Sequence, residues 1–159
     1  MIIVNFVLLV AFHCFSGTNS PPSPDQTLSL VITLAHQTVS AGSEVKIKTK
    51  LTNSSDHVVT FFDTNFDCDY PTEVRDDKGN PAPQTPYRRE LKCSERLGDT
   101  RNILVTLKPQ ESIDEEIVVN KLYDLSRPGD YLIQVSRTVP KKLGGGSIKS
   151  NTIMITLTQ

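Results

Sequence analysis

Hydrophobic and polar residues alternate along most of the chain from residue 27 onward, and this period of two predicts β-strands. Segment 27–36 (TLSLVITLAH) places its leucines and Ile32 on one side, and 44–51 (EVKIKTKL) alternates lysines with apolar residues and Thr49. Strands of this kind bury one face and expose the other, as in antiparallel sheets. The residues expected to face the core are Leu28, Leu30, Ile32, Leu34, Val45, Ile47, Thr49 and Leu51.

The same alternation continues after a turn at 53–56 (NSSD), whose side chains bond their own backbone. Further strands are expected within 57–62, 72–83, 101–109, 112–120, 131–139 and 152–158. Their inward residues are expected to be Val74, Ile103, Val105, Leu107, Ile113, Ile117, Val119, Tyr131, Ile133, Val135, Ile153, Ile155 and Leu157. About eight short strands with turn signals between them predict one all-β domain over 27–159, an antiparallel β-sandwich with Greek-key connections. A small barrel is the alternative.

Two segments interrupt the alternation. The charged stretch 83–99 (PQTPYRRELKCSERLGD) is expected to form one long irregular loop, with a helical turn near 88–97. The glycine-rich stretch 143–147 (LGGGS) lies between two strands, so we interpret it as a flexible hairpin tip. A phosphate-binding loop would need a helix directly after it, and no helix signal follows.

The N-terminus has the layout of a secretory signal. Residues 2–12 are apolar apart from Asn5, and small or polar residues follow them. This stretch is shorter than the roughly 20 residues that a membrane anchor needs. We therefore expect a signal peptide over 1–20, a Pro-rich linker over 21–26 and a secreted or periplasmic product; a buried first strand is the alternative. Cys14 would be lost with the signal.

The charge is balanced, with 17 basic and 18 acidic side chains and a formal net charge of −1. This balance gives no electrostatic attraction to nucleic acid or to anionic lipid. No second apolar stretch approaches membrane length, and the C-terminal TLTQ carries no lipidation signal. We expect a mature form without a membrane anchor whose partner is an unidentified protein.

Residues 122–135 (LYDLSRPGDYLIQV) resemble the tyrosine corner of immunoglobulin-like and fibronectin-like sandwiches, with Tyr131 as the corner residue. Together with 51–61 and 107–119, this stretch resembles immunoglobulin-like modules of bacterial secreted proteins. It is also similar to the pro-domains of deuterolysin-type metallopeptidases, and more loosely to an intracellular proteinase inhibitor of bacilli. The resemblance implies an immunoglobulin-like sandwich of about seven to nine strands. Because the chain has no HExxH motif, only a role like that of a pro-domain or an inhibitor could carry over.

Catalytic residues and cofactors are not expected. His36 and His57, the histidines that remain after signal removal, have no cysteine or second histidine at metal-ligand spacing, and we expect both to be exposed. A serine hydrolase would need a nucleophile on a sharp turn, but no GxSxG motif is present. The sequence therefore predicts a protein that is not an enzyme.

The acidic run 63–69 (DTNFDCD) is the most conspicuous polar cluster. Measured against an EF-hand loop that starts at Asp63, Cys68 replaces the required glycine and Val74 replaces the bidentate glutamate. A looser calcium site that adds Asp76 or Asp77 is an alternative. We interpret the run as a solvated acidic strand end that discourages edge pairing.

Cys68 and Cys93 are the cysteines that remain after signal removal, and in an oxidising compartment they are expected to form a disulfide. This bond would tie the 83–99 loop to the sandwich. Asn53 opens the sequon NSS and is a candidate glycosylation acceptor. Because it lies in a predicted turn, we expect it to be exposed.

These expectations favour an exported, non-catalytic immunoglobulin-like module for protein binding or envelope assembly. The alternative is a proteinase inhibitor or a relative of a peptidase pro-domain that acts through the 83–99 loop. A carbohydrate-binding domain would need exposed aromatic residues that stack on sugar, and the chain has no Trp and only four Tyr.

Overall fold

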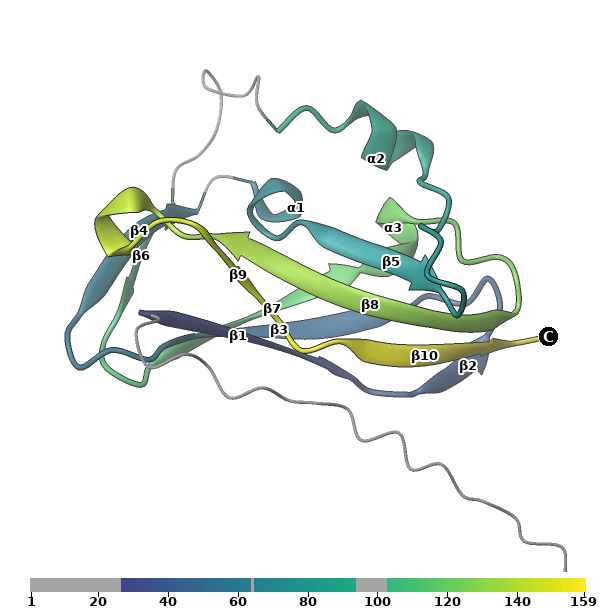
Figure 1. Ribbon diagram of the computed structural model, residues 1–159, viewed down its shortest axis with the longest axis horizontal. Coiled ribbons are helices and arrows are strands. Elements are labelled where there is room, and N and C mark those ends of the chain that lie inside the picture. Colours follow the sequence, from purple (N-terminus) through teal and green to yellow (C-terminus); the bar gives the residue numbers. More distant parts are fainter. Residues whose placement is uncertain (1–26, 64, 94–102) are drawn as a thin grey trace, which may run out of the picture.

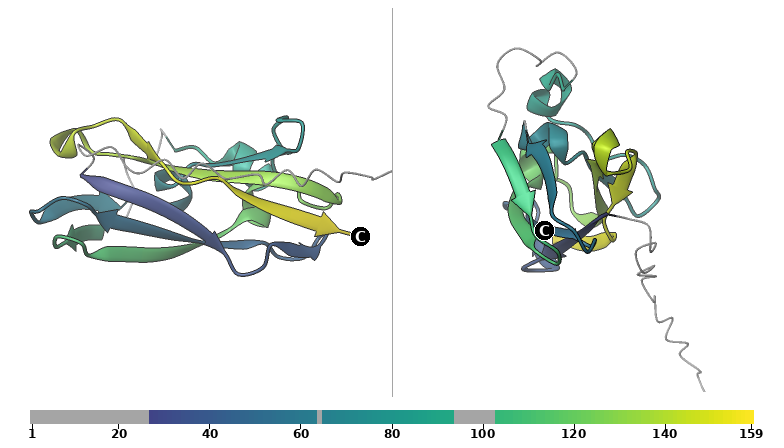
Figure 2. Two further views of the ribbon diagram at one scale, coloured as in Figure 1. Left: turned by 60° about the horizontal axis from the view of Figure 1, so that its bottom comes forward. Right: turned by 90° about the vertical axis from the view of Figure 1, so that its left-hand side faces the viewer.

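The computed structural model describes residues 27–63, 65–93 and 103–159. The predicted signal peptide, 1–20, and the predicted linker, 21–26, lie outside the described residues. Two β-sheets form the two layers of the described chain, and three short helices gather along one side of it (Figures 1 and 2).

The first sheet has three antiparallel strands in the order β1-β3-β7, with β1 at Leu28–Leu34, β3 at Lys46–Asn53 and β7 at Ser112–Val118. Burial alternates along β3, where the lysines are exposed and Ile47, Thr49, Leu51 and Asn53 are buried. The period of two therefore predicted this strand correctly. The aspartate and glutamates of β7 lie opposite lysines and Thr49 of β3.

The second sheet follows the order β2-β10-β8-β5, with β9 also paired to β8. Its strands are β2 (Thr38–Ser40), β5 (Thr72–Asp76), β8 (Gly129–Thr138), β9 (Ser147–Lys149) and β10 (Ile153–Thr158). The β2–β10 pair is parallel and the others are antiparallel. The predicted hairpin tip at 143–147 overlaps the β8–β9 connection: Leu143 ends a short 3₁₀ helix, η1 (Lys141–Leu143), and Ser147 begins β9.

A separate two-stranded ribbon joins β4 (Val59–Asp63) to β6 (Ile103–Leu107). The order β1-β3-β7 matches strands A-B-E of an immunoglobulin-like sandwich, and β5-β8-β10 matches strands C-F-G. The all-β sandwich predicted from the sequence is therefore confirmed. The barrel alternative is wrong, because the two sheets are separate.

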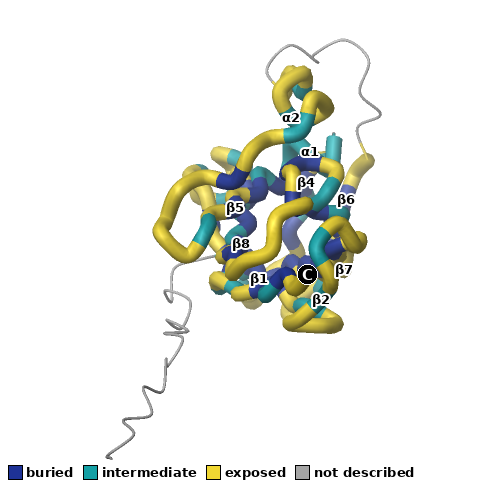
Figure 3. The backbone as a smooth tube through the Cα atoms, turned by 90° about the vertical axis from the view of Figure 1, so that its right-hand side faces the viewer, coloured by how far each residue is buried: buried dark blue, intermediate teal, exposed yellow. Residues whose placement is uncertain are grey.

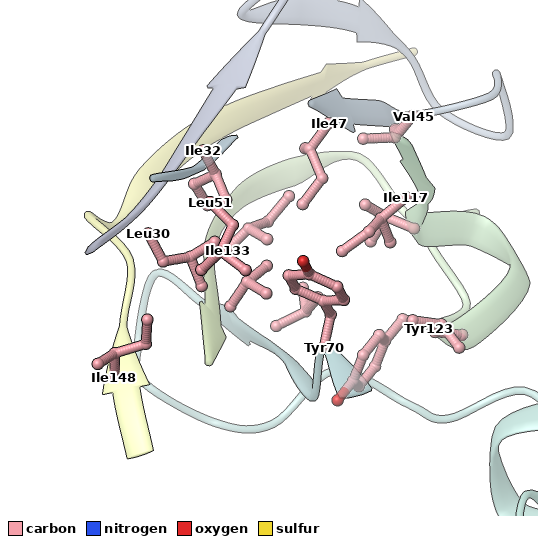
Figure 4. Close-up of a cluster of buried hydrophobic side chains, with 14 of the residues drawn as sticks. Leu30, Ile32, Val45, Ile47, Leu51, Tyr70, Ile117, Tyr123, Ile133 and Ile148 are labelled. Atoms are coloured by element: carbon pink, nitrogen blue, oxygen red, sulfur yellow. The ribbon is translucent and has the colours of Figure 1, made fainter. Parts of the chain in front are cut away.

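The core lies between the sheets and consists of the inward residues of both. Figure 4 shows Ile47 and Ile117 from the first sheet close to Ile133 from the second, with the ring of Tyr70 between them. Each of these isoleucines is at most 3% exposed. Burying one such side chain contributes about 1.5 to 3 kcal/mol to folding, which makes this cluster the main source of stability.

Several details differ from the sequence prediction, including the short strands β2 and β9, which were not predicted. Ile103 was expected to be buried but is 63% exposed, because it lies at the far end of the β4–β6 ribbon. Val119 is fully buried as predicted, but it begins the short helix α3 (Val119–Leu122) and does not continue strand β7. The third predicted strand begins at Val59 and not at His57.

The hydroxyl groups of Tyr131 and Tyr70 differ in their hydrogen bonding. The hydroxyl of Tyr131, near the start of β8, donates to the carbonyl of Arg127 at 3.1 Å, which is the upstream backbone bond of a tyrosine corner. The hydroxyl of Tyr70 points into the apolar cluster (Figure 4) and has no hydrogen-bond partner among the described residues. Burial raises the pKa of Tyr70 to about 12.

We predict that Tyr131→Phe lowers the free energy of unfolding by about 1 kcal/mol, the usual net value of one hydrogen bond. Tyr70→Phe is the matched control. It removes a buried hydroxyl that bonds to no described residue, so stability should stay the same or rise. Urea denaturation of the three proteins measures both effects. An unchanged midpoint for Tyr131→Phe would contradict the corner assignment.

Candidate functional site

Three short helices lie together on one side of the sandwich: α1 (Phe66–Asp69), α2 (Pro86–Glu90) and α3. We call residues 83–93, which contain α2, the α2 rim. Figure 3 shows this segment raised above the sheets and coloured mostly as exposed. The predicted helical turn is present but lies at Pro86–Glu90, earlier than the expected 88–97. Residues 94–99 of the predicted loop lie outside the described residues.

The start of the α2 rim is fixed by local capping and by backbone bonds. Thr85 caps α2 by accepting a hydrogen bond from the Arg88 amide, and Pro86 occupies the first helical position, where a missing N–H costs nothing. The Thr85 amide donates to the Leu122 carbonyl at 3.0 Å, and its hydroxyl donates to the Lys121 carbonyl at 2.7 Å. This end of α2 is therefore held against α3.

Asp67 joins all three helices through its carboxylate. Its Oδ2 accepts hydrogen bonds from the Tyr87 hydroxyl at 2.5 Å and from Lys121 Nζ at 2.7 Å, and Lys121 Nζ lies 4.4 Å from the centre of the Tyr87 ring. Burial opposes ionisation of this carboxylate, but the bonds from Lys121 and Tyr87 outweigh it and lower its pKa. The same carboxylate raises the pKa of Lys121. We call Asp67, Tyr87 and Lys121 the rim clamp.

The predicted disulfide between Cys68 and Cys93 is confirmed, with the two Cα atoms 5.4 Å apart. It connects α1 to the far end of the α2 rim across a sequence separation of 25 residues. In the chain-entropy model, a bond that closes a loop of this size is worth roughly 3 kcal/mol, mostly through its effect on the unfolded chain. The rim is thus anchored at its start by Thr85, in its middle by the clamp and at its end by the disulfide.

A cleft of about 530 Å³ opens between the α2 rim and the segment that follows α3. Its lining comes from three parts of the chain: Gly42, Pro83, Gln84, Thr85, Pro86, Arg89, Asn120, Tyr123, Asp124, Leu125 and Ser126. Its volume is within the usual range for ligand pockets. The sequence prediction placed a contact on the rim but did not identify the opposite wall of this cleft.

Beneath the rim lies a buried cluster that the sequence reasoning missed. Arg137 of β8 is only 3% exposed, forms an ion pair with Asp63 at the end of β4, and lies 4.6 Å from the Tyr70 ring and 5.1 Å from the Phe61 ring. The alternation of β8 could have predicted that Arg137 is buried, because Arg137 lies an even number of residues from the inward Ile133 and Val135.

The acidic run 63–69 is not the solvated strand end that we expected. Asp63 pairs with Arg137, Asp67 forms the rim clamp, and Asp69 accepts a hydrogen bond from the Asn65 amide. Asn65 in turn caps α1 by accepting from the Asp67 amide at 3.1 Å. These oxygens are used for local structure, because they bond to nearby backbone amides, to the buried Arg137 and to the exposed Lys121.

Asn53 also differs from the expectation. It is fully buried, its Nδ2 donates to the carbonyls of His57 and Leu107 at 2.7 and 3.0 Å, and its Oδ1 accepts from the Ser55 amide and hydroxyl. The turn at 53–56 is built around this side chain, so the predicted exposure is wrong. The amide nitrogen on which a glycan would be built is not accessible in the folded domain. His36 and His57 are exposed, as expected.

Residues 27–63, 65–93 and 103–159 contain no group of three or more His, Cys, Asp or Glu side chains placed to hold a metal ion. Over the same ranges, no helix is long and apolar enough to cross a membrane.

Comparison with known proteins gives structural likeness only. No family model matches the chain, and no curated protein matches it. Among solved structures, the chain is similar to a CARDB domain from Pyrococcus furiosus, with 13% identity and a TM-score of 0.43, covering 83% of this chain and 94% of that one. It is also similar to PapD-like domain 7 of human CEP192, with 12% identity and a TM-score of 0.36, covering 94% and 99% of the two chains.

We predict that Asp67→Asn destabilises the domain near neutral pH and that this difference shrinks in acid. The folded-state pKa of Asp67 is lowered, so its contribution is present above the ordinary aspartate pKa of about 3.9 and is lost as the pH falls through the folded value. Urea denaturation at about pH 7 and pH 3 measures this, with the exposed Asp77→Asn as control. A difference that is equal at both pH values would contradict the rim clamp.

Calcium is expected to have little effect on stability. The carboxylates of Asp63 and Asp67 are already paired with Arg137 and Lys121, so a cation would have to displace an existing partner. The measurement is a thermal melt with added calcium and with chelator. A calcium-dependent rise of several degrees would show that the acidic run binds the ion.

Proposed function

We propose that this chain is an exported, non-catalytic binding module that contacts a protein partner, or a component of an envelope assembly, through the α2 rim. The observation that carries the proposal is the fixed but raised position of this rim. It projects above the sandwich and is attached at three points, through Thr85, the rim clamp and the Cys68–Cys93 bond. A loop fixed before binding loses less conformational entropy when its partner binds.

The side chains of α2 suit a protein interface. Tyr87 is 39% exposed although its hydroxyl is bonded to Asp67, and Arg89 is exposed beside it. Tyrosine and arginine are enriched at the positions that contribute most to protein binding. The partner would therefore contact the fixed aromatic ring of Tyr87 and the neighbouring guanidinium of Arg89.

Export is supported by the N-terminal sequence and by the disulfide. Disulfides persist in secreted and periplasmic proteins and are rare in the reducing cytosol. Cys93 is exposed, so cellular thiols could reach the bond if the chain stayed in a reducing compartment.

A peptidase inhibitor is the second candidate, and the disulfide-anchored rim favours it because a rigid projecting loop can occupy a peptidase cleft. An inhibition assay against serine, cysteine and metallopeptidases separates the two roles. Inhibition at micromolar concentration would favour the inhibitor, and its absence would favour the binding module.

We predict that a photo-crosslinker at the rim captures the partner. Glu90→p-benzoylphenylalanine, illuminated in the exported fraction, should give one dominant adduct, since Glu90 is exposed on α2 and leaves the rim clamp intact. Met154→p-benzoylphenylalanine is the control, because Met154 is 44% exposed and lies on the second sheet. Identical adduct patterns at the two positions, or none at Glu90, would contradict the proposed interface.

Mass spectrometry of non-reduced protein from the exported fraction tests the compartment. We expect a chain that begins after residue 16 or 20 and has no alkylatable thiol, because Cys14 is removed and the other cysteines are bonded. An intact N-terminus with free thiols would argue for a cytoplasmic protein.

A further inference from the structure

The cleft beside the α2 rim has the features of a recognition site for a short peptide. One wall is formed by the α2 rim and the other by the segment that follows α3. The Asp124 amide donates to the Pro83 carbonyl at 2.8 Å, and the Gly42 amide donates to the Leu125 carbonyl at 3.2 Å, so backbone bonds hold both walls in place. This inference rests on the proposed function and concerns the chemistry of the partner.

Arg89 is the only cationic side chain among the described residues that line the cleft. Its Nη1 donates to the Gln84 carbonyl at 2.7 Å, which fixes the guanidinium while most of its donors stay available. A guanidinium held in this way matches a carboxylate, because it offers paired N–H groups in a planar fork.

The acidic residue of the lining, Asp124, makes its side-chain hydrogen bonds within its own segment of the chain. The side-chain hydrogen bond from Ser126 is the main cause that lowers the pKa of Asp124, and the bond that Oδ1 accepts from the Ser126 amide at 3.0 Å lowers it further. Among the described residues, Asp124 forms no ion pair with Arg89, so the charge of the guanidinium is available to a ligand.

The remaining lining suits peptide backbone and small apolar groups. Pro83 and Pro86 give apolar surface, while the side-chain amide of Gln84 makes no hydrogen bond to another described residue. We propose that this cleft binds an extended segment of a partner protein that presents a glutamate or aspartate side chain to Arg89.

The test is a titration of the isotope-labelled, oxidised protein, followed by amide NMR shifts. The probe is the blocked pentapeptide Gly-Ala-Glu-Ala-Gly, with its glutamine counterpart and sodium acetate as comparison ligands. We expect saturable shifts confined to 83–89 and 120–126, at least about tenfold weaker binding of the glutamine peptide, and weaker binding of acetate. Equal binding of the two peptides, or of acetate and the glutamate peptide, would overturn the proposal.

Two variants and a control test whether the amide NMR shifts arise from peptide binding in the cleft. Arg89→Gln should weaken binding of the glutamate peptide by about tenfold or more, the value of a hydrogen bond to a charged group. Ser126→Phe should block binding by filling the cleft, and Lys142→Gln, which removes a distant exposed charge, should leave binding unchanged. Unaltered spectra outside the cleft establish that each variant is folded. Binding that survives Arg89→Gln or Ser126→Phe would contradict the site.

The outcome for the cleft is separable from that for the rim. If crosslinking at Glu90 persists in Arg89→Gln and the peptides do not bind, the acidic-peptide inference fails and the proposed function stands. If crosslinking at Glu90 is absent from the protein that carries no other substitution, the proposed function itself fails.

Discussion

The burial of one cation, Arg137, is the constraint on which the arrangement beneath the rim depends. A guanidinium with 3% exposure is tolerated only when a negative charge and polarisable surfaces surround it, and here Asp63, Tyr70 and Phe61 provide them. These partners come from β4 and from the end of α1. The cation therefore ties the β4–β6 ribbon and α1 to the central strand β8.

The position of the α2 rim depends on this attachment of α1 to β8. Helix α1 carries Asp67 and Cys68 between its two ends, so fixing Tyr70 at its end also places the clamp carboxylate and the disulfide sulfur. The α2 rim then bonds to both of them and to α3. A projecting segment with only one helical turn thus acquires a defined shape, which is the property that the proposed binding role requires.

The period of two was sufficient to predict the sandwich, because burial repeats at every second residue in β3 and β8. It could not reveal the partner of Arg137, since Asp63 lies 74 residues away and only tertiary packing brings the two together. Asn53 and Asp67 were misjudged for a related reason. Asn53 in a predicted turn and Asp67 in a predicted acidic strand end were both taken as solvated, although the fold uses their hydrogen bonds internally.

The most direct test of this account compares Asp63→Ala with Arg137→Met, using urea denaturation and amide hydrogen exchange. Removing Asp63 leaves a buried cation without its charge partner and should cost about 3 kcal/mol or more, with faster exchange in β4, α1 and the α2 rim. Arg137→Met should cost less, because Asp63 is 21% exposed and can be hydrated. Stability changes below about 0.5 kcal/mol in Asp63→Ala, the usual range for a surface substitution, would contradict the account.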